Sequence, residues 1–234
     1  MNALSLGRNL QENRWAILGE IGVILGTTQL MLVVSDALGG ATLRGGLVGW
    51  LALVLAVVLV WWSLRLRGLG WAAIGLGRPR RWLWTVLLAP VVAGITIVVV
   101  NVVVTHLVLP FVHNAPNSSR FAVLHGNLLA LVFGLVSVWT SAAFGEEILA
   151  RGYLIGRLAN LLGGSQRAWV AGTVLSAVVF GAMHFYQGAA GMVLTGLVGL
   201  VFGVVYLLLG RNLWVLVLAH GLIDTVSFIS IYAR

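Results

Sequence analysis

The sequence predicts an all-α, polytopic integral membrane protein with about seven transmembrane helices, in a range of six to eight. Of its 234 residues, 60% are hydrophobic and only 9% are charged, and the mean hydropathy is +1.05. A chain with so few polar residues cannot cover the surface of a water-soluble globule. Its apolar residues also gather in runs of about 20, the length that a helix needs to cross a bilayer.

Seven apolar runs follow one another, separated by polar, glycine-rich or arginine-rich residues. The first run follows a polar segment and resembles an uncleaved signal anchor. No polar linker is long enough to separate two domains, so we expect a single membrane domain over residues 1–234. The expected spans lie within residues 15–34, 46–64, 82–112, 121–144, 168–186, 189–209 and 213–232.

The distribution of arginine predicts how the chain is oriented. All fourteen basic residues are arginine, and the net charge is +8. In a seven-span chain, only Arg44, Arg120 and Arg234 fall on the side opposite the N-terminus. Basic residues favour the cytoplasmic side, so we expect a multi-pass protein of the cell membrane with a cytoplasmic N-terminus. The arginines share no single soluble face, which argues against a nucleic-acid partner and favours membrane lipids.

One acidic residue, Glu20, lies inside the first apolar run. Its carboxyl group either contacts a substrate or the functional site, or is satisfied by a neighbouring helix or the membrane interface. A carboxylate in an apolar helix needs a partner in either case. We favour the second interpretation.

Two adjacent carboxylates and an arginine end the fourth apolar run, in the segment E-E-I-L-A-R. Glu147 and Arg151 are four residues apart, so on a helix they share a face and can pair, whereas Glu146 points to the neighbouring face. An unpaired ionisable group in a membrane is costly and marks a candidate functional site. The chain has no cysteine, which excludes a thiolate nucleophile and a cysteine metal site.

Two further motifs supply possible partners for Glu146. The fifth run carries F-G-A-M-H, from Phe180 to His184, and the seventh carries H-G-L-I-D, from His220 to Asp224. His220 and Asp224 are four residues apart and can act on one point in space. A neighbouring helix can satisfy each of these groups for purely structural reasons. Their presence on successive motif-bearing helices nevertheless predicts that they converge on one site.

Hydropathy alone places the two halves of this site at different depths. Glu146 would lie near the inner end of its span, and His184 near the outer end of the next. The two side chains can meet only if one helix is displaced along the membrane normal. We therefore expect the helix with the glutamates to run on to about Asn160, with the glutamates deeper in the membrane than hydropathy predicts.

The ordered motifs E-E-x-x-x-R, F-x-x-x-H and H-x-x-x-D resemble the CPBP (ABI) family of intramembrane proteases. That family includes the type II CAAX prenyl endopeptidase and bacteriocin-processing or immunity proteins. The resemblance covers roughly residues 120–230, which would form the catalytic core, while residues 1–119 would supply N-terminal spans and a basic cytoplasmic loop. G-Y-L after the arginine and N-L-W before the last motif also fit the family.

The resemblance implies a role for each residue of the first two motifs. Glu146 would be the general base that activates water for attack on a peptide carbonyl, and His184 would bind or polarise the same water. Burial of the carboxylate in an apolar cavity would suit it to that role. Glu147 would be the structural partner of Arg151, with Phe180 as a further supporting residue.

The last motif departs from the family pattern. The resemblance implies that His220 and the residue four later stabilise the developing oxyanion. The prenyl endopeptidase has Asn at that later position, and Asp224 can donate a hydrogen bond only when protonated, so it can instead orient His220. No cofactor is favoured. The alternative is a divalent metal such as zinc held by Glu146, His184 and His220, although the H-E-x-x-H arrangement is absent.

These features predict an intramembrane endopeptidase with a polar cavity that opens to the cytoplasm. Its substrate would be a peptide or lipidated protein at the membrane, either prenylated or of the leader type. The alternatives are a non-catalytic immunity or scaffold protein of the same fold, or a small transporter, although the chain shows no inverted repeat. The compact length and exclusive use of arginine favour a bacterial source. The pattern specifies no oligomeric state.

Overall fold

The computed structural model describes residues 10–108, 110–111 and 115–234, and within these ranges the chain is helical and contains no strand. In this described part of the chain, six helices are long and apolar enough to cross a membrane, so the predicted fold class is confirmed and the protein is a multi-pass membrane protein. These candidate spans are Arg14–Ala37, Leu43–Leu66, Trp82–Leu107, Leu128–Leu161, Phe185–Leu208 and Leu213–Tyr232.

The described elements include eight α-helices and several short segments of other helical winding. The α-helices are α2 (Arg14–Ala37), α3 (Leu43–Leu66), α4 (Trp82–Val103), α5 (Leu128–Ser137), α6 (Ile155–Leu161), α7 (Gln166–Met183), α8 (Gly188–Leu208) and α9 (Leu213–Tyr232). The 3₁₀ segments are η1 (Trp71–Ile74), η3 (Ser119–Leu124) and η6 (Phe185–Gln187), and the π-helical segments are η2 (Val104–Val108), η4 (Val138–Glu146) and η5 (Ile148–Leu154).

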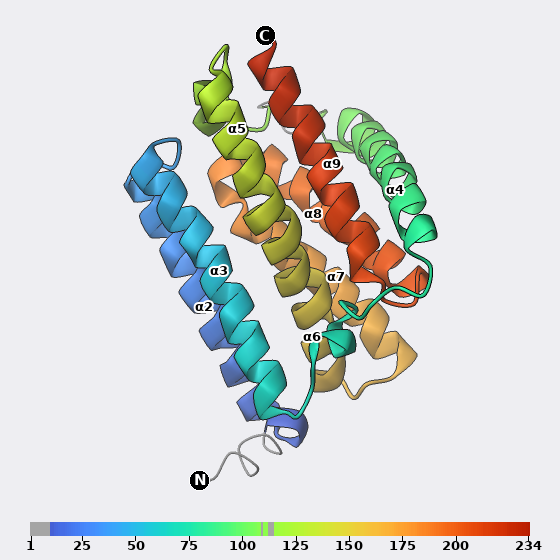
Figure 1. Cartoon of the computed structure of the whole chain (residues 1–234). Helices are drawn as coiled ribbons and strands as arrows, with labels where there is room; N and C mark the ends of the chain where they lie inside the picture. The colour runs from blue at the N-terminus through green and yellow to red at the C-terminus, as the bar shows by residue number, and fades with distance from the viewer. Residues whose placement is uncertain (1–9, 109, 112–114) are drawn as a thin grey trace.

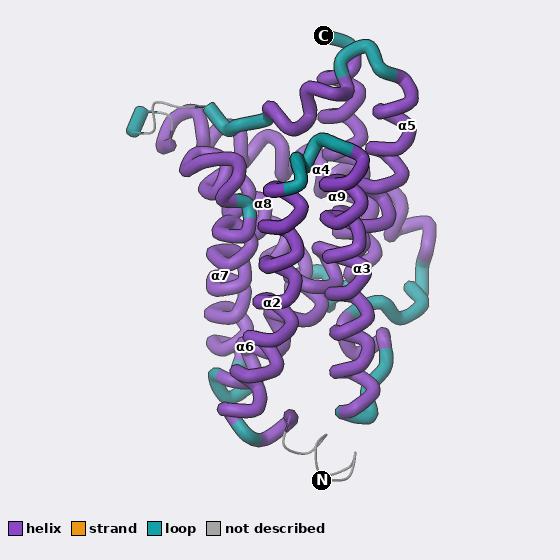
Figure 2. The backbone as a smooth tube through the Cα atoms, turned by 90° about the vertical axis from the view of Figure 1, so that its left-hand side faces the viewer, coloured by secondary structure: helices purple, strands orange, loops and turns teal. Residues whose placement is uncertain are grey.

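The helices assemble into one bundle (Figures 1 and 2). α2 and α3 form an antiparallel hairpin along one side, and α5 and α9 lie next to each other (Figure 1). α7 packs closely on α8. The approach is so close that a Cβ atom at Gly181 would lie 2.5 Å from the carbonyl oxygen of Met192, and one at Gly203 would lie 2.5 Å from Thr173. Small residues are what allow two membrane helices to approach this closely.

Capping side chains fix where several helices begin. Asn127 accepts a hydrogen bond from the backbone of α5, and Asn212 does the same for α9, which satisfies amide groups left free at a helix start. The fourth span therefore begins at Leu128 rather than at Phe121, because Ser119–Leu124 is a separate 3₁₀ segment ahead of the Asn127 cap.

One continuous helix carries both glutamates through the bundle, from Leu128 to Leu161. It runs past the motif to the neighbourhood of Asn160, as predicted. On both sides of Glu147 it is wound as a π-helix, a rare conformation that is frequent at functional sites. Glu146 lies near the middle of this 34-residue helix and not at one end.

A second buried charge cluster ties the N-terminal hairpin to this helix. Glu20 in α2 accepts a hydrogen bond from Arg157 of α6 at 2.5 Å and another from the hydroxyl of Ser63 in α3. Arg67 donates to the same hydroxyl at 3.0 Å. Glu20 is thus satisfied by neighbouring helices, which confirms the interpretation that the sequence favoured.

Replacing Glu20 by glutamine is expected to destabilise the protein by about 3 kcal/mol, because Arg157 would keep a buried charge without its counter-ion. Arg157 is only 2% exposed, so water cannot take over that role. Thermal unfolding in detergent measures the change. Glu12→Gln is the control, since Glu12 is exposed and its variant should shift stability by less than about 0.5 kcal/mol. Equal midpoints for the two variants would contradict the role assigned to this cluster.

Candidate active site

Glu147 and Arg151 form a fully buried ion pair. A guanidinium nitrogen of Arg151 donates to Glu147 Oε1 at 2.7 Å, and the two side chains are 1% and 0% exposed. The guanidinium also lies over the rings of Phe180 and Phe202, 4.3 and 5.3 Å from their centroids. Contact with ring faces lowers the cost of holding a cation away from water. The pairing predicted from their four-residue spacing is present.

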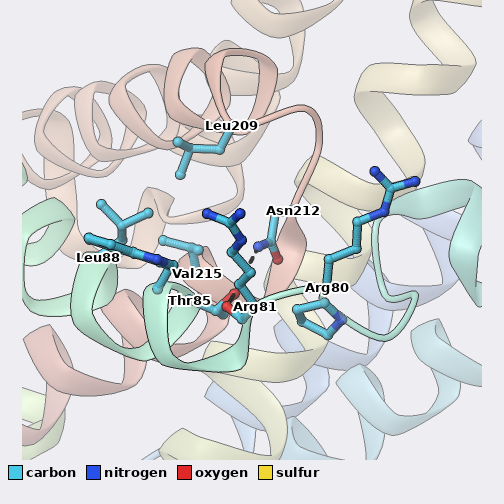
Figure 3. Close-up of a pocket in the computed structure, with 9 residues that line it drawn as sticks. Arg80, Arg81, Thr85, Leu88, Leu209, Asn212 and Val215 are labelled. Carbon is cyan, nitrogen blue, oxygen red and sulfur yellow. Dashed lines mark hydrogen bonds between the residues drawn. The ribbon is translucent and has the colours of Figure 1, made fainter.

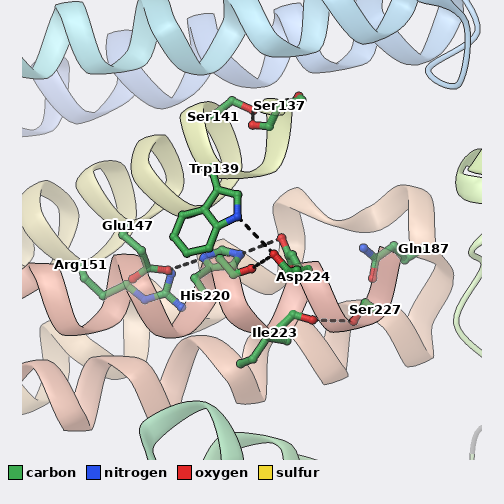
Figure 4. Close-up of polar contacts among 12 residues, drawn as sticks. Ser137, Trp139, Ser141, Glu147, Arg151, Gln187, His220, Ile223, Asp224 and Ser227 are labelled. Carbon is green, nitrogen blue, oxygen red and sulfur yellow. Dashed lines mark hydrogen bonds and ion pairs between the residues drawn. The ribbon is translucent and has the colours of Figure 1, made fainter. Parts of the chain in front are cut away.

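The same carboxylate oxygen also holds His220. Nδ1 of His220 lies 2.8 Å from Glu147 Oε1, and Nε2 faces Asp224 Oδ2 at 3.5 Å (Figure 4). A carboxylate oxygen accepts from two donors readily, whereas 3.5 Å is long for a hydrogen bond. Glu147 is therefore more than a partner of Arg151, because it also fixes the orientation of the His220 ring.

His184 follows the last residue of α7, where its ring is half-buried. Its Nδ1 donates to the carbonyl oxygen of Phe180 at 2.8 Å. A carbonyl can only accept, so the proton lies on Nδ1 and the neutral ring keeps a lone pair on Nε2. That nitrogen can accept a hydrogen bond from water.

Glu146 lies among these groups without being bound to any of them. Its side chain is half-buried and forms no hydrogen bond or ion pair with any residue in the described part of the chain. It is close enough to His184 and His220 to interact electrostatically with both, and also with Asp224. Glu146 in η4 thus lies in the same region of the bundle as His184, at the end of α7, and as His220 and Asp224 in α9.

The described side chains do not form a ready-made metal site. Among the described residues, no group of three His, Asp or Glu side chains is placed to hold a metal ion. Nδ1 of His220 is committed to Glu147, so only Nε2, which faces Asp224 at 3.5 Å, is left to act as a ligand.

The site also contains residues that carry no motif. Phe202 in α8 lies against Arg151, and its ring centroid is 6.0 Å from that of His220. The indole of Trp139 donates to Thr225 at 3.2 Å (Figure 4). It also covers Gly221, where a Cβ atom would lie 2.5 Å from the ring. In the sequence, only the glycine after His220 could have indicated this contact, because a glycine allows another side chain to approach the backbone closely.

Comparison with known proteins agrees with the family resemblance of the motifs. Residues 127–226 match the family described as type II CAAX prenyl endopeptidase Rce1-like. The matched range begins at the cap of α5 and ends within α9, so it contains all the site residues described above. Comparisons with curated proteins and with solved structures gave no match. Residues 127–226, somewhat less than half of the chain, are therefore similar to the type II CAAX prenyl endopeptidase Rce1-like family.

Proposed function

We propose that the protein is an intramembrane endopeptidase in which Glu146 is the general base. The observation that carries this proposal is the contrast between the two adjacent glutamates. Glu147 is fully buried and committed to Arg151 and His220, whereas Glu146 is half-buried and has no bonded partner among the described residues. An unpaired carboxylate beside two histidines is available to take a proton from water.

In the proposed reaction, water is held between Glu146 and Nε2 of His184. Glu146 removes one proton while the water oxygen attacks the carbonyl carbon of the scissile peptide. The resulting tetrahedral intermediate collapses as Glu146 returns that proton to the leaving amide nitrogen. The immediate products are a new carboxylic acid and a new amine, the acid then gives its proton to solvent or to the amine, and the enzyme is unchanged. The hydrogen bond from Nδ1 of His184 to Phe180 fixes the ring in the tautomer that this water needs.

His220 is the proposed donor to the developing oxyanion. Its Nδ1 is committed to Glu147, so Nε2 is the nitrogen that can turn toward substrate. Asp224 lies 3.5 Å from Nε2, too long for a firm bond but near enough to favour a proton on that nitrogen. A preorganised donor at an oxyanion is worth two to three orders of magnitude in rate, roughly.

The proposed substrate is a peptide or protein held at the membrane by a lipid or an apolar segment. The family description names prenyl endopeptidases, which favours a prenylated chain over a leader peptide. Glu146 lies near the middle of a membrane-spanning helix, so the scissile bond must enter the bilayer. A lipid anchor supplies the binding energy for that step.

The proposal is tested by hydrolysis of a farnesylated peptide in proteoliposomes. His184→Ala is expected to lower the cleavage rate about a hundredfold, since it removes the group that positions the water. His125→Ala is the matched control, because His125 is exposed before α5, outside the site. Cleavage by the wild type should persist after exhaustive chelation. If His184→Ala kept full activity while folded, or the wild type cleaved no membrane peptide, the scaffold and transporter alternatives would be favoured.

Asp224→Asn is expected to lower the cleavage rate about tenfold, because the loss of the carboxylate weakens its hold on the Nε2 proton of His220. Asparagine has the same size as aspartate, so the substitution should not disturb the packing around this half-buried position. Steady-state cleavage of the same peptide measures the effect. A variant that matched or exceeded the wild type would show that residue 224 donates directly to the oxyanion, as Asn does in the family pattern.

A further inference from the structure

The basic loop between α3 and α4 is hydrogen-bonded to the first residues of α9. Leu213 donates to the carbonyl oxygen of Gly75 at 3.1 Å, and the indole of Trp214 donates to that of Gly77 at 3.2 Å. Gly75 has a φ of +87°, and a Cβ atom there would lie 1.9 Å from the carbonyl oxygen of Arg211. Only glycine fits this contact. The arginines that follow in the loop are therefore carried on a fixed backbone.

A cavity of about 430 Å³ lies where this loop meets α4 and the turn between α8 and α9. Arg80, Arg81, Trp84 and Asn212 line it together with apolar side chains such as Leu88 (Figure 3). The Asn212 amide donates to Thr85 at 3.1 Å and joins the α9 side of the cavity to α4. The cavity thus has an apolar wall and a rim of hydrogen-bond donors.

The rim is positively charged and lacks counter-ions. Arg80 and Arg81 are exposed, and neither lies within 4.0 Å of a carboxylate in the described ranges. The whole sequence contains only six acidic residues, and none lies between residues 37 and 145. Arginine binds phosphate through two parallel N–H bonds, a geometry that favours phosphate over other anions.

The outer surface beside the cavity faces lipid. Leu83, Trp84 and Leu87 of α4 are exposed, at 69%, 56% and 50%. Tryptophan at the end of a membrane helix is typical of the level of the lipid headgroups. The sequence predicts that this arginine-rich end is cytoplasmic, where anionic lipids gather. A phosphate in the cavity would therefore belong to a molecule whose chains lie along the exposed apolar face of α4.

We propose that this cavity binds the phosphate of an anionic phospholipid, with Arg80 and Arg81 as ligands and its acyl chains against Leu83 and Leu87. None of the residues assigned to catalysis lines the cavity, so this site does not depend on the proposed peptidase reaction. The lipid would fix the depth of α4 and of the turn that begins α9. The helix α9 also carries His220, but the bound lipid would contact only the beginning of that helix, away from His220.

Native mass spectrometry of the full chain tests the proposal with phosphatidylglycerol and phosphatidylcholine of matched acyl chains. The wild type should retain phosphatidylglycerol in preference to phosphatidylcholine. Arg80→Gln/Arg81→Gln should weaken that retention about 10- to 30-fold, given the strength of arginine–lipid attraction at a membrane surface. The matched control is Arg65→Gln/Arg78→Gln, which removes the same charge from exposed positions near the same end, outside the cavity. The control should retain the lipid as the wild type does.

Three results would overturn the proposal. Equal loss in both double variants would show diffuse attraction to the basic surface and no defined site. Retention by the Arg80→Gln/Arg81→Gln variant would show that the lipid binds elsewhere. Equal retention of phosphatidylglycerol and phosphatidylcholine by the wild type would show that the cavity does not select an anionic headgroup. Circular dichroism of each variant confirms that it is folded, which is expected because all four side chains are exposed.

Discussion

Glu146→Gln should reduce peptide cleavage about a thousandfold, the loss expected when a positioned general base is removed. Glutamine keeps the size of the side chain but cannot accept the proton of the attacking water. Glu146 has no hydrogen bond or ion pair with the described residues, so the fold should be retained. Cleavage of the farnesylated peptide in proteoliposomes measures the rate, and thermal unfolding measures stability.

The stability measurement separates a catalytic role from a structural one. An unchanged unfolding midpoint with the rate lost places Glu146 in the chemistry. Glu12→Gln, an exposed control, should change neither quantity. A Glu146→Gln variant that cleaves at the wild-type rate would remove this residue from the mechanism, whatever the activity of the family.

Glu147→Gln should have the opposite signature, with a large loss of stability. Neutralising Glu147 leaves the Arg151 charge buried without a counter-ion, which costs about 3 to 5 kcal/mol. The rings of Phe180 and Phe202 offset part of this, because they remain in contact with the guanidinium. The folded fraction should also cleave about 10- to 100-fold more slowly, because His220 loses the partner that orients it. Thermal unfolding in detergent measures the first effect.

A double variant tests whether the stability effect comes from the buried charge. Glu147→Gln/Arg151→Met removes both charges and should recover most of the stability lost in Glu147→Gln. Its cleavage rate should remain low, because the oxygen that receives His220 is no longer a carboxylate. If the double variant were as unstable as the sum of the two single variants, the ion pair would not be the source of the effect.

The helices and the motifs were predictable because both depend on local sequence. Hydropathy over about 20 residues predicted the six candidate spans, although α7, where a seventh was expected, is not among them, and the four-residue spacing of Glu147 and Arg151 predicted their ion pair. The structure corrects the boundary of the fourth span, which starts at Leu128, because a 3₁₀ segment and the Asn127 cap come before it. Polar groups in apolar helices also marked the candidate site, since each needs a reason to be there.

The contacts within the site depend on how helices are rotated and at what depth they pack. Hydropathy alone separated Glu146 from His184, whereas the helix runs from Leu128 to Leu161, has Glu146 near its middle and is π-wound on both sides of Glu147. Hydrophobic periodicity at an α-helical repeat cannot predict such winding.

The sequence by itself therefore determined the membrane class, the helices and the identity of the polar residues. Only the tertiary structure decided that one oxygen of Glu147 receives both Arg151 and His220, and that Phe202 covers the same guanidinium. The physical reason is that these contacts join helices far apart in the chain. Their geometry follows from side-chain packing between helix faces, which no local pattern contains.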